Sequence, residues 1–251
     1  MDVAITVLGP VGATVDGRPA ALGGPRRRAL LATLVAAAGE TVEAERLLDE
    51  VWAGRRTPGV GTLHFYVSTL RSALEPARGP GEAPRVVVRR ASGYALDLPP
   101  GAVDAERFTV LAADGAAALT GRRAEQALPL LDAALALWHG PAYADVADLG
   151  VLAPEVARLT ELRLGAQEDR LAALLERGRA GEAAAAAGAH VRRHPLRERG
   201  WELRIRALHR QGRRAEALAD LKAVRALLAG ELGLDPGPAL QAAEREVLTA
   251  V

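Results

Sequence analysis

Short stretches of alternating apolar and polar residues open the chain, and they predict strands. Val3, Ile5 and Val7 recur at every second position, which places them on one face of an extended strand. Asp16-Gly17 follows as a hairpin signal, because these residue types tolerate the positive φ angles that tight turns require. The first part of the chain is therefore expected to form a small antiparallel sheet.

Three helices are predicted behind this sheet, from apolar residues that recur three and four positions apart. Pro25 opens the first helix, because a proline in the first helical turn loses no hydrogen bond, and Thr41 is expected to cap the second. The apolar residues of the third helix form one stripe: Leu63, Val67, Leu70 and Leu74. That stripe should pack on the first two helices, which leaves the opposite face of the third helix exposed.

A two-stranded hairpin is predicted after a loop rich in glycine and proline. Residues 85–90 and 94–98 are its strands, and Ala91-Ser92-Gly93 is its turn. The order of sheet, three helices and hairpin predicts an α+β winged helix-turn-helix over residues 1–98. Pro99-Pro100-Gly101 marks a linker behind it.

Residues 102–251 have the pattern of an all-α domain. A Gly-Arg-x-x-Glu motif begins at Gly121, Gly178 and Gly212, and the last two copies are 34 residues apart. This is the period of tetratricopeptide repeats, in which paired helices stack to share one core. The longer first interval requires an insertion, which a helix from about Pro154 to Arg177 would supply. Chance recurrence in a chain rich in Ala, Arg, Glu and Gly is the alternative.

The exposed face of the third helix carries the candidate DNA-reading residues. Phe65 lies about 200° around the helix from Leu63 and should point to solvent, where a thymine methyl group is a suitable partner. Two alternatives remain, in which Phe65 packs under a loop or at a dimer interface. For Arg71, a phosphate contact and an ion pair with an acid of the second helix are equally open. The candidates for DNA binding on this helix are Thr62, Phe65, Tyr66, Ser68, Thr69, Arg71 and Ser72.

Motifs in both halves resemble those of the SARP antibiotic regulatory activators, in the same order along the chain. They are LGGPRRRALL from Leu22, RLLDEVW from Arg46, TLHFYVSTLR from Thr62, Arg90 with Gly93-Tyr94, LWHGP from Leu137, HPLRE from His194 and ELGLDPGP from Glu231. The resemblance covers nearly the full sequence. It implies an OmpR-type winged helix fused to a tetratricopeptide-like bacterial transcriptional activation domain, in the short form without a downstream ATPase module.

The resemblance also implies roles for arginines outside the third helix. Arg90 corresponds to the arginine that related winged helices insert into the minor groove, and Arg89 can meet a phosphate; narrow A·T-rich grooves attract such side chains. Two solvated charges on a hairpin are the alternative. Arg55 and Arg56 lie in the loop that touches RNA polymerase in the family, although a phosphate contact or plain solvation is equally open.

Some positions of the third helix depart from the family pattern. Similar proteins usually carry arginine where this chain has Thr69, and often arginine or asparagine around Val60 and Gly61. A bidentate arginine to guanine contributes about 1–3 kcal/mol of discrimination, so base recognition is expected to be weaker or differently aimed. The arginines at 26–28 either lie over the DNA backbone or cover the sheet with their stems.

Composition excludes several other functions. The net charge is only +1, so DNA binding depends on the local placement of arginines, and the absence of cysteine excludes disulfides and thiolate chemistry. No apolar run reaches the roughly 18 residues that a membrane span needs, and a cytoplasmic protein is expected. Catalytic motifs are missing, so neither an enzyme nor a cofactor is predicted. His190 and His194 have metal-ligand spacing, but Pro195 ends the helix and a third ligand is missing, so no metal is expected.

These features predict a DNA-binding transcriptional activator. The resemblance implies that it switches on a biosynthetic gene cluster, and that its partners are double-stranded DNA, RNA polymerase and a second copy of the chain on direct repeats. A rival hypothesis is a repeat-type interaction adaptor whose degenerate winged helix no longer reads sequence, which the missing arginines favour. A small-molecule sensor that uses the helical groove is a third. A DNA footprint separates the first two, because an adaptor leaves none at moderate salt.

Overall fold

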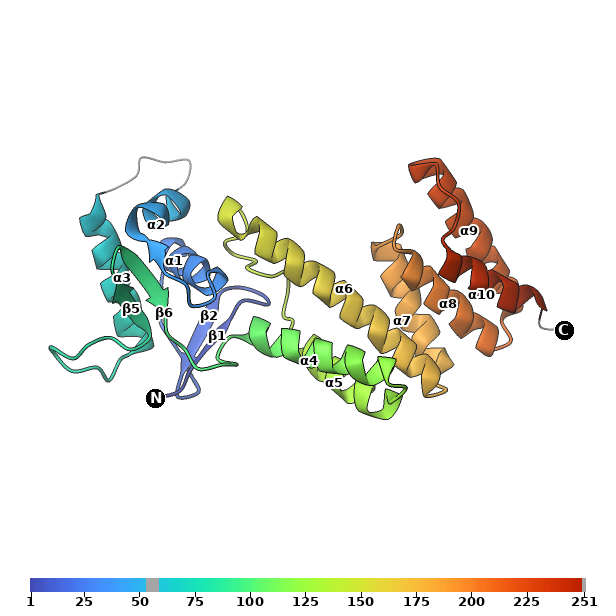
Figure 1. Cartoon of the computed structure of the whole chain (residues 1–251), viewed down its shortest axis with the longest axis horizontal. Helices are drawn as coiled ribbons and strands as arrows, with labels where there is room; N and C mark the ends of the chain where they lie inside the picture. Colours follow the sequence, from blue (N-terminus) through green and yellow to red (C-terminus); the bar gives the residue numbers. More distant parts are fainter. Residues whose placement is uncertain (53–58, 250–251) are drawn as a thin grey trace. The chain divides into compact units, whose positions relative to one another are not determined.

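The computed structural model describes residues 1–52 and 59–249, and its contacts divide the chain into two compact units (Figure 1). The N-terminal unit consists of Met1–Val110 and Ala134–Arg163. The C-terminal unit consists of Leu111–Ala133 and the chain from Leu164 onward. A winged helix-turn-helix of the α+β class is followed by an all-helical region, which confirms the predicted fold class.

A three-stranded antiparallel sheet begins the N-terminal unit, as the alternating pattern predicted. Its strands are β1 (Val3–Thr6), β2 (Gly12–Val15) and β3 (Arg18–Pro19), in that spatial order. Asp16 and Gly17 both adopt positive φ at the turn between β2 and β3. The alternating residues of β1 are buried, and Ile5 has no exposed surface.

Helices α1 (Pro25–Ala36), α2 (Ala44–Val51) and α3 (Val60–Leu74) form a three-helix core. The predicted stripe of α3 is confirmed, because its four members are 0–1% exposed. The expectation that Thr41 caps α2 is wrong. A short strand, β4 (Val42–Glu43), separates Thr41 from α2, which starts at Ala44 without a side-chain cap.

The wing consists of β5 (Val87–Arg90) and β6 (Gly93–Leu96), and the spatial order of its sheet is β4-β6-β5. Both strands are shorter than predicted. Arg85 falls outside β5, and its N–H is donated to the buried Glu75 carboxylate over 2.7 Å. This bond ties the loop behind α3 to the base of the wing.

The loop between the fifth and sixth helices corrects the expectation that everything behind the linker is helical. Residues 137–149 form turns. The N–H of His139 donates to the Leu8 carbonyl and the N–H of Tyr143 to the Val7 carbonyl, each over 2.8 Å. Trp138 and Tyr143, which fall inside the segment predicted as all-α, lie in this loop. Both are buried, and the Trp138 ring meets Phe108 edge-on, so they belong to the core of the N-terminal unit.

The helical region starts with α4 (Asp104–Thr120) and α5 (Ala124–Ala136), and a 3-10 turn, η1 (Gly150–Leu152), precedes α6. The long helix predicted from about Pro154 is α6 (Ala153–Glu176). Four further helices pack on their neighbours in the C-terminal unit: α7 (Ala180–Arg193), α8 (Glu198–Arg210), α9 (Arg214–Leu232) and α10 (Pro238–Thr249).

The second and third copies of the Gly-Arg motif are structurally equivalent. Gly178 and Gly212 take left-handed φ angles of 71° and 73°, which end α6 and α8. The arginine after each glycine forms a two-point ion pair with the glutamate three residues on, at 2.6–2.7 Å, and a new helix begins there. The 34-residue spacing therefore corresponds to a repeated helix turn.

The first copy is displaced by one residue from the predicted alignment. Arg122, rather than Gly121, takes the left-handed angle, with φ 55°. The N–H of Arg123 then reaches back to the Ala118 carbonyl over 2.8 Å, as the equivalent arginines 179 and 213 do in the later copies. The predicted alignment of the motif is therefore correct in two of the three turns. It is off by one residue in the first, because Arg122 rather than a glycine takes the left-handed conformation there.

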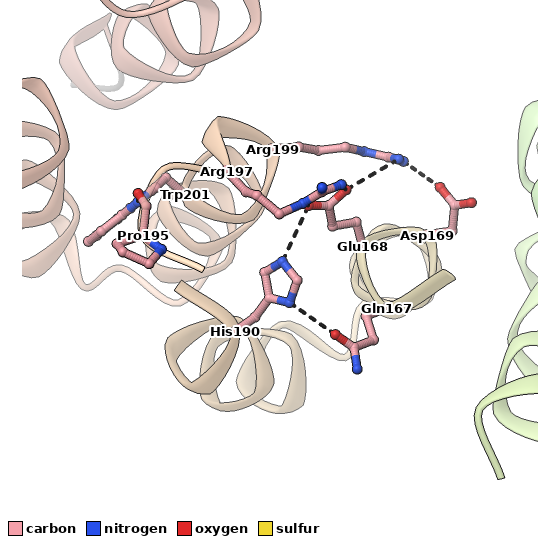
Figure 2. Close-up of polar contacts among 8 residues, drawn as sticks. All are labelled: Gln167, Glu168, Asp169, His190, Pro195, Arg197, Arg199 and Trp201. Atoms are coloured by element: carbon pink, nitrogen blue, oxygen red, sulfur yellow. Dashed lines mark hydrogen bonds and ion pairs between the residues drawn. The ribbon is translucent and has the colours of Figure 1, made fainter. Parts of the chain in front are cut away.

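A buried ion-pair cluster connects three helices of the C-terminal unit (Figure 2). The Glu168 side chain on α6 is 2% exposed, and its carboxylate accepts from the Arg197 guanidinium at 2.7 and 3.1 Å. His190 on α7 contacts the same carboxylate at 3.3 Å and Gln167 at 3.2 Å. Burial alone raises the pKa of Glu168, but hydrogen bonds and positive charge from His190 and Arg197 lower it to about 2.

Candidate nucleic-acid interface

The outward face of α3 is dominated by Phe65, whose side chain stands on a well-anchored helix. Phe65 is 67% exposed, whereas Leu63, two residues before it, is completely buried. The predicted outward direction of Phe65 is therefore confirmed. Among the residues that the structure describes, its ring contact is with Tyr66, at 5.8 Å between ring centres. Such an exposed aromatic ring is available to a partner.

Hydroxyl groups flank Phe65 on the same face. The Thr69 hydroxyl donates to the Phe65 carbonyl over 2.8 Å, and the Ser72 hydroxyl donates to the Ser68 carbonyl over 3.2 Å. Ser68 and Ser72 are exposed, while Thr62 and Thr69 are half-buried. The oxygen lone pairs remain available as acceptors, and each hydroxyl becomes a donor to another molecule only after it rotates away from the helix.

Tyr66 lies at the margin of this face and is held by the end of α2. Its ring meets Trp52 edge-on at 5.2 Å, and Trp52 is buried. The guanidinium of Arg26 lies 5.8 Å from the Trp52 ring and donates to the Val51 carbonyl. Tyr66 is therefore half-buried and held in one direction.

A small hollow of about 230 Å³ separates the face of α3 from the first turn of α1. It is lined by Gly24, Pro25, Arg26, Arg27, Phe65, Tyr66 and Thr69. Arg26 is engaged with α2, and Arg28 forms an ion pair with Asp145 at 2.5 Å. Within the described part of the chain, the Arg27 side chain has no hydrogen bond or ion pair, and its guanidinium packs beside Gly23. The sequence could not separate these three arginines, because their partners come from distant segments.

The wing arginines project from the end of the hairpin. Arg89 and Arg90 are both exposed, and they pair in register with Tyr94 and Gly93 of β6. Gly93 is required here, because a Cβ at this position would lie 2.0 Å from the Val42 carbonyl oxygen of β4. The hairpin thus presents two adjacent cations at a position fixed by the neighbouring strand.

Arg71 differs from the other candidates on α3. It is half-buried; its Nε donates to the Val87 carbonyl over 2.8 Å and its guanidinium lies 5.6 Å from the Tyr94 ring. The alternative of an ion pair with an acid of α2 is wrong, because these wing residues hold the side chain instead. Burial lowers the pKa of Arg71, and nearby Tyr94 partly offsets that effect.

Other predicted sites lie elsewhere or outside the described residues. Arg55 and Arg56 belong to residues 53–58, which are not described. The two ring nitrogens of His190 contact Gln167 and Glu168, and no group of three or more metal-ligand side chains gathers within residues 1–52 and 59–249. No helix in the described ranges combines the length and apolarity needed to cross a membrane.

Two family models match the chain, one for each half. Residues 18–96 match the model described as transcriptional regulatory protein, C terminal, and residues 103–248 match the bacterial transcriptional activator domain. Both models describe parts of transcriptional regulators rather than enzymes. The matched segments contain the winged helix, from β3 to β6, and the helices from α4 to α10.

Known proteins similar to this chain are regulatory proteins. Regulatory protein AfsR of Streptomyces coelicolor is 40% identical to this chain. The match covers 97% of this chain and 24% of AfsR. Regulatory protein DnrI of Streptomyces peucetius is 34% identical, with 98% of the chain and 92% of that protein covered. The chain thus spans about a quarter of the length of one relative and nearly all of another.

A solved structure agrees with the fold over nearly the full sequence. It is that of Mycobacterium tuberculosis EmbR in complex with a low affinity phosphopeptide. The TM-score is 0.89 at 34% identity, and the match covers 98% of this chain and 65% of that one. The order of winged helix and helical region is therefore shared with an experimentally determined regulator.

Proposed function

This chain belongs to the SARP family of bacterial transcriptional regulators, and on that premise we propose that it is a sequence-specific DNA-binding activator. The observation that carries the proposal is the open face of α3: Phe65 is 67% exposed on a helix whose opposite side is fully buried. A helix of 15 residues with one free face has the size and shape that enter a major groove.

In the major groove, Phe65 contacts a thymine methyl group and the neighbouring hydroxyls meet base edges or phosphates. Apolar contact with the methyl group distinguishes thymine from the other bases. Tyr66 and Ser68 complete the reading surface together with Thr62, Thr69 and Ser72. Because Thr69 stands where relatives usually have arginine, the preference of this chain differs from theirs at the base that arginine would read.

In the adjacent minor groove, Arg90 enters between the strands and Arg89 contacts a phosphate. Both side chains are exposed on a hairpin that β4 holds in place. A narrow A·T-rich minor groove has an enhanced negative potential, so the wing favours such sequences beside the bases that α3 reads. The two contacts together require DNA in which both features lie at a fixed spacing.

The finer parts of the proposal rest on the family. Two copies bind side by side on direct repeats, and the bound chain recruits RNA polymerase through Arg55 and Arg56 to activate a biosynthetic gene cluster. Repeats that bind copies on one side of the duplex are separated by about one helical turn, or 10–10.5 base pairs. This spacing is a geometric expectation that DNA selection can test.

The test begins with selection of duplexes from a random pool by the full chain, followed by affinity measurement over a salt series. Phe65→Ala should change the preference at a single base position, and Arg90→Ala should weaken binding and reduce A·T preference beside it. Val110→Ala and Arg192→Ala are matched controls, because Val110 is an exposed apolar residue on α4 and Arg192 an exposed arginine on α7. Failure to enrich any sequence would reject DNA reading and favour the interaction adaptor.

A further inference from the structure

We propose that Arg71 is a positioning residue, which clamps the wing to α3 so that Arg90 and Phe65 meet DNA at a fixed separation. The inference rests on the proposed DNA binding and adds the device that couples its two contacts. Arg71 acts through the wing and does not itself bind a phosphate. This assigns a role different from that of its neighbours on the exposed face.

The contacts of Arg71 reach both strands of the wing. Its Nε–H bonds to Val87 at the start of β5, and its guanidinium lies 5.6 Å from the ring of Tyr94 on β6. In the hairpin register Tyr94 pairs with Arg89, and the next pair is Arg90 with Gly93. The clamp therefore lies one ladder pair away from the arginine that the proposal places in the minor groove.

The guanidinium is held at an energetic cost. Its Nη2 is buried and has no hydrogen-bond partner among the described residues, and such an unsatisfied group costs about 1–3 kcal/mol. The charge-assisted bond from Nε to Val87 offsets part of this cost. An apolar side chain would leave no unpaired donor here, so the feature that arginine adds is direction. Its planar group bonds to one strand of the wing and contacts the aromatic ring of the other.

The wing needs such a support because its own sheet is small. β5 and β6 have four residues each, and β4, which completes the sheet, has two. A two-stranded hairpin is marginal in water without a further strand or a helix against it. If the hairpin turns relative to α3, the tip and Phe65 no longer match one duplex, although each surface remains intact.

A double-mutant cycle separates this role from a direct phosphate contact. The probe is the duplex selected by the unaltered chain, and the variants are Arg71→Met, Arg90→Ala and their combination. A clamp that acts through the wing lowers affinity about tenfold in the unaltered background and less than about twofold once Arg90 is absent. The salt slope is compared in a chain that carries Arg89→Ala and Arg90→Ala, because a displaced wing would otherwise lose its own phosphate contact. In that background, Arg71→Met should leave the slope of log affinity against log salt unchanged.

Two further variants complete the test. Arg71→Lys keeps the charge but loses the planar group, so it should bind as weakly as Arg71→Met. Thr69→Ala is the matched control on α3, and its effect should add to that of Arg90→Ala. Urea unfolding of each variant verifies that the fold persists, and a variant that does not fold is replaced by Arg71→Lys in the cycle.

Three results would overturn the clamp. The first is a fall of about 0.9 in the salt slope for Arg71→Met in the chain that lacks both wing arginines, which indicates a phosphate contact of Arg71 itself. The second is an equal loss of affinity with and without Arg90, and the third is full affinity of Arg71→Lys. If the unaltered chain selects no sequence at all, the proposed function fails instead, so the two failures are distinguishable.

Discussion

Replacing the Glu168 carboxylate with an amide tests how α6 is fastened to α7 and α8. Glu168→Gln keeps the shape of the side chain but removes the negative charge that Arg197 and His190 face (Figure 2). Removing one member of a buried ion pair leaves the other charge without compensation and typically costs about 3–5 kcal/mol. Because Arg197 is partly exposed and the amide oxygen still accepts one hydrogen bond, we expect Glu168→Gln to lower the unfolding free energy by about 3 kcal/mol at pH 7.

The pH dependence supplies an independent magnitude. The pKa of Glu168 is lowered from 4.5 to about 2 in the folded chain, which corresponds to about 3 kcal/mol. Because the pKa of Glu168 is lower in the folded chain than in the unfolded chain, its ionised form stabilises the fold. This contribution is complete at pH values above the unfolded pKa, and it disappears as the pH falls toward 2. By pH 3 the original chain should have lost about 2 kcal/mol of unfolding free energy through protonation of Glu168. Glu168→Gln has no carboxyl group at this position and should not show that loss. The difference between the two proteins should therefore shrink to about 1 kcal/mol.

Other charged groups near this carboxylate must be included in the comparison. Asp169 lies beside it on α6 and pairs with Arg199, and His194 caps the C-terminal end of α7. Burial, together with the charges of His190 and nearby arginines, lowers the pKa of His194. The Glu168 charge opposes this lowering of the His194 pKa and is the smallest of its causes, so most of these contributions cancel in the difference between the original chain and Glu168→Gln.

The assay is urea unfolding followed by circular dichroism at pH 7 and pH 3, with hydrogen exchange of α7 and α8 at pH 7 as a local measure. Asp169→Asn is the matched control, because its partner Arg199 is 45% exposed and such pairs contribute only about 0–1 kcal/mol. A Glu168→Gln variant as stable as the original at pH 7, or a difference that stays constant down to pH 3, would refute the reasoning.

Three further predictions concern the N-terminal unit. Asp104→Ala should cost about 2–5 kcal/mol of unfolding free energy, because two buried backbone N–H groups lose their acceptor, and Asp104→Asn should cost less; urea titration decides. Arg27→Ala should lower the salt slope of DNA binding by about 0.9, whereas Arg26→Ala, whose guanidinium is engaged internally, should leave it unchanged. Gly93→Ala should cost at least about 1–3 kcal/mol, since its Cβ meets backbone of Val42 at 2.0 Å, and an unchanged midpoint would contradict that close approach.

The periodic positions of the sequence determined most of the winged helix. Apolar residues that recur with the helix or strand period show which face of the element is buried, and that information is local in the sequence. The stripe from Leu63 to Leu74 therefore predicted both the core side of α3 and the outward direction of Phe65. The repeated glycines at 178 and 212 likewise predicted equivalent turns, because a left-handed helix end favours glycine wherever it occurs.

Only the tertiary structure decided what each arginine does. Arg26, Arg27 and Arg28 are neighbours of identical chemistry, yet they differ because Val51, Trp52 and Asp145 approach two of them from elsewhere in the fold. The same holds for the segment 137–149. Three of its backbone N–H groups donate to the carbonyls of residues 7–9, directly after β1, rather than to a helix of its own. Periodicity fixes the face on which a side chain stands, but its partner depends on contacts between distant segments.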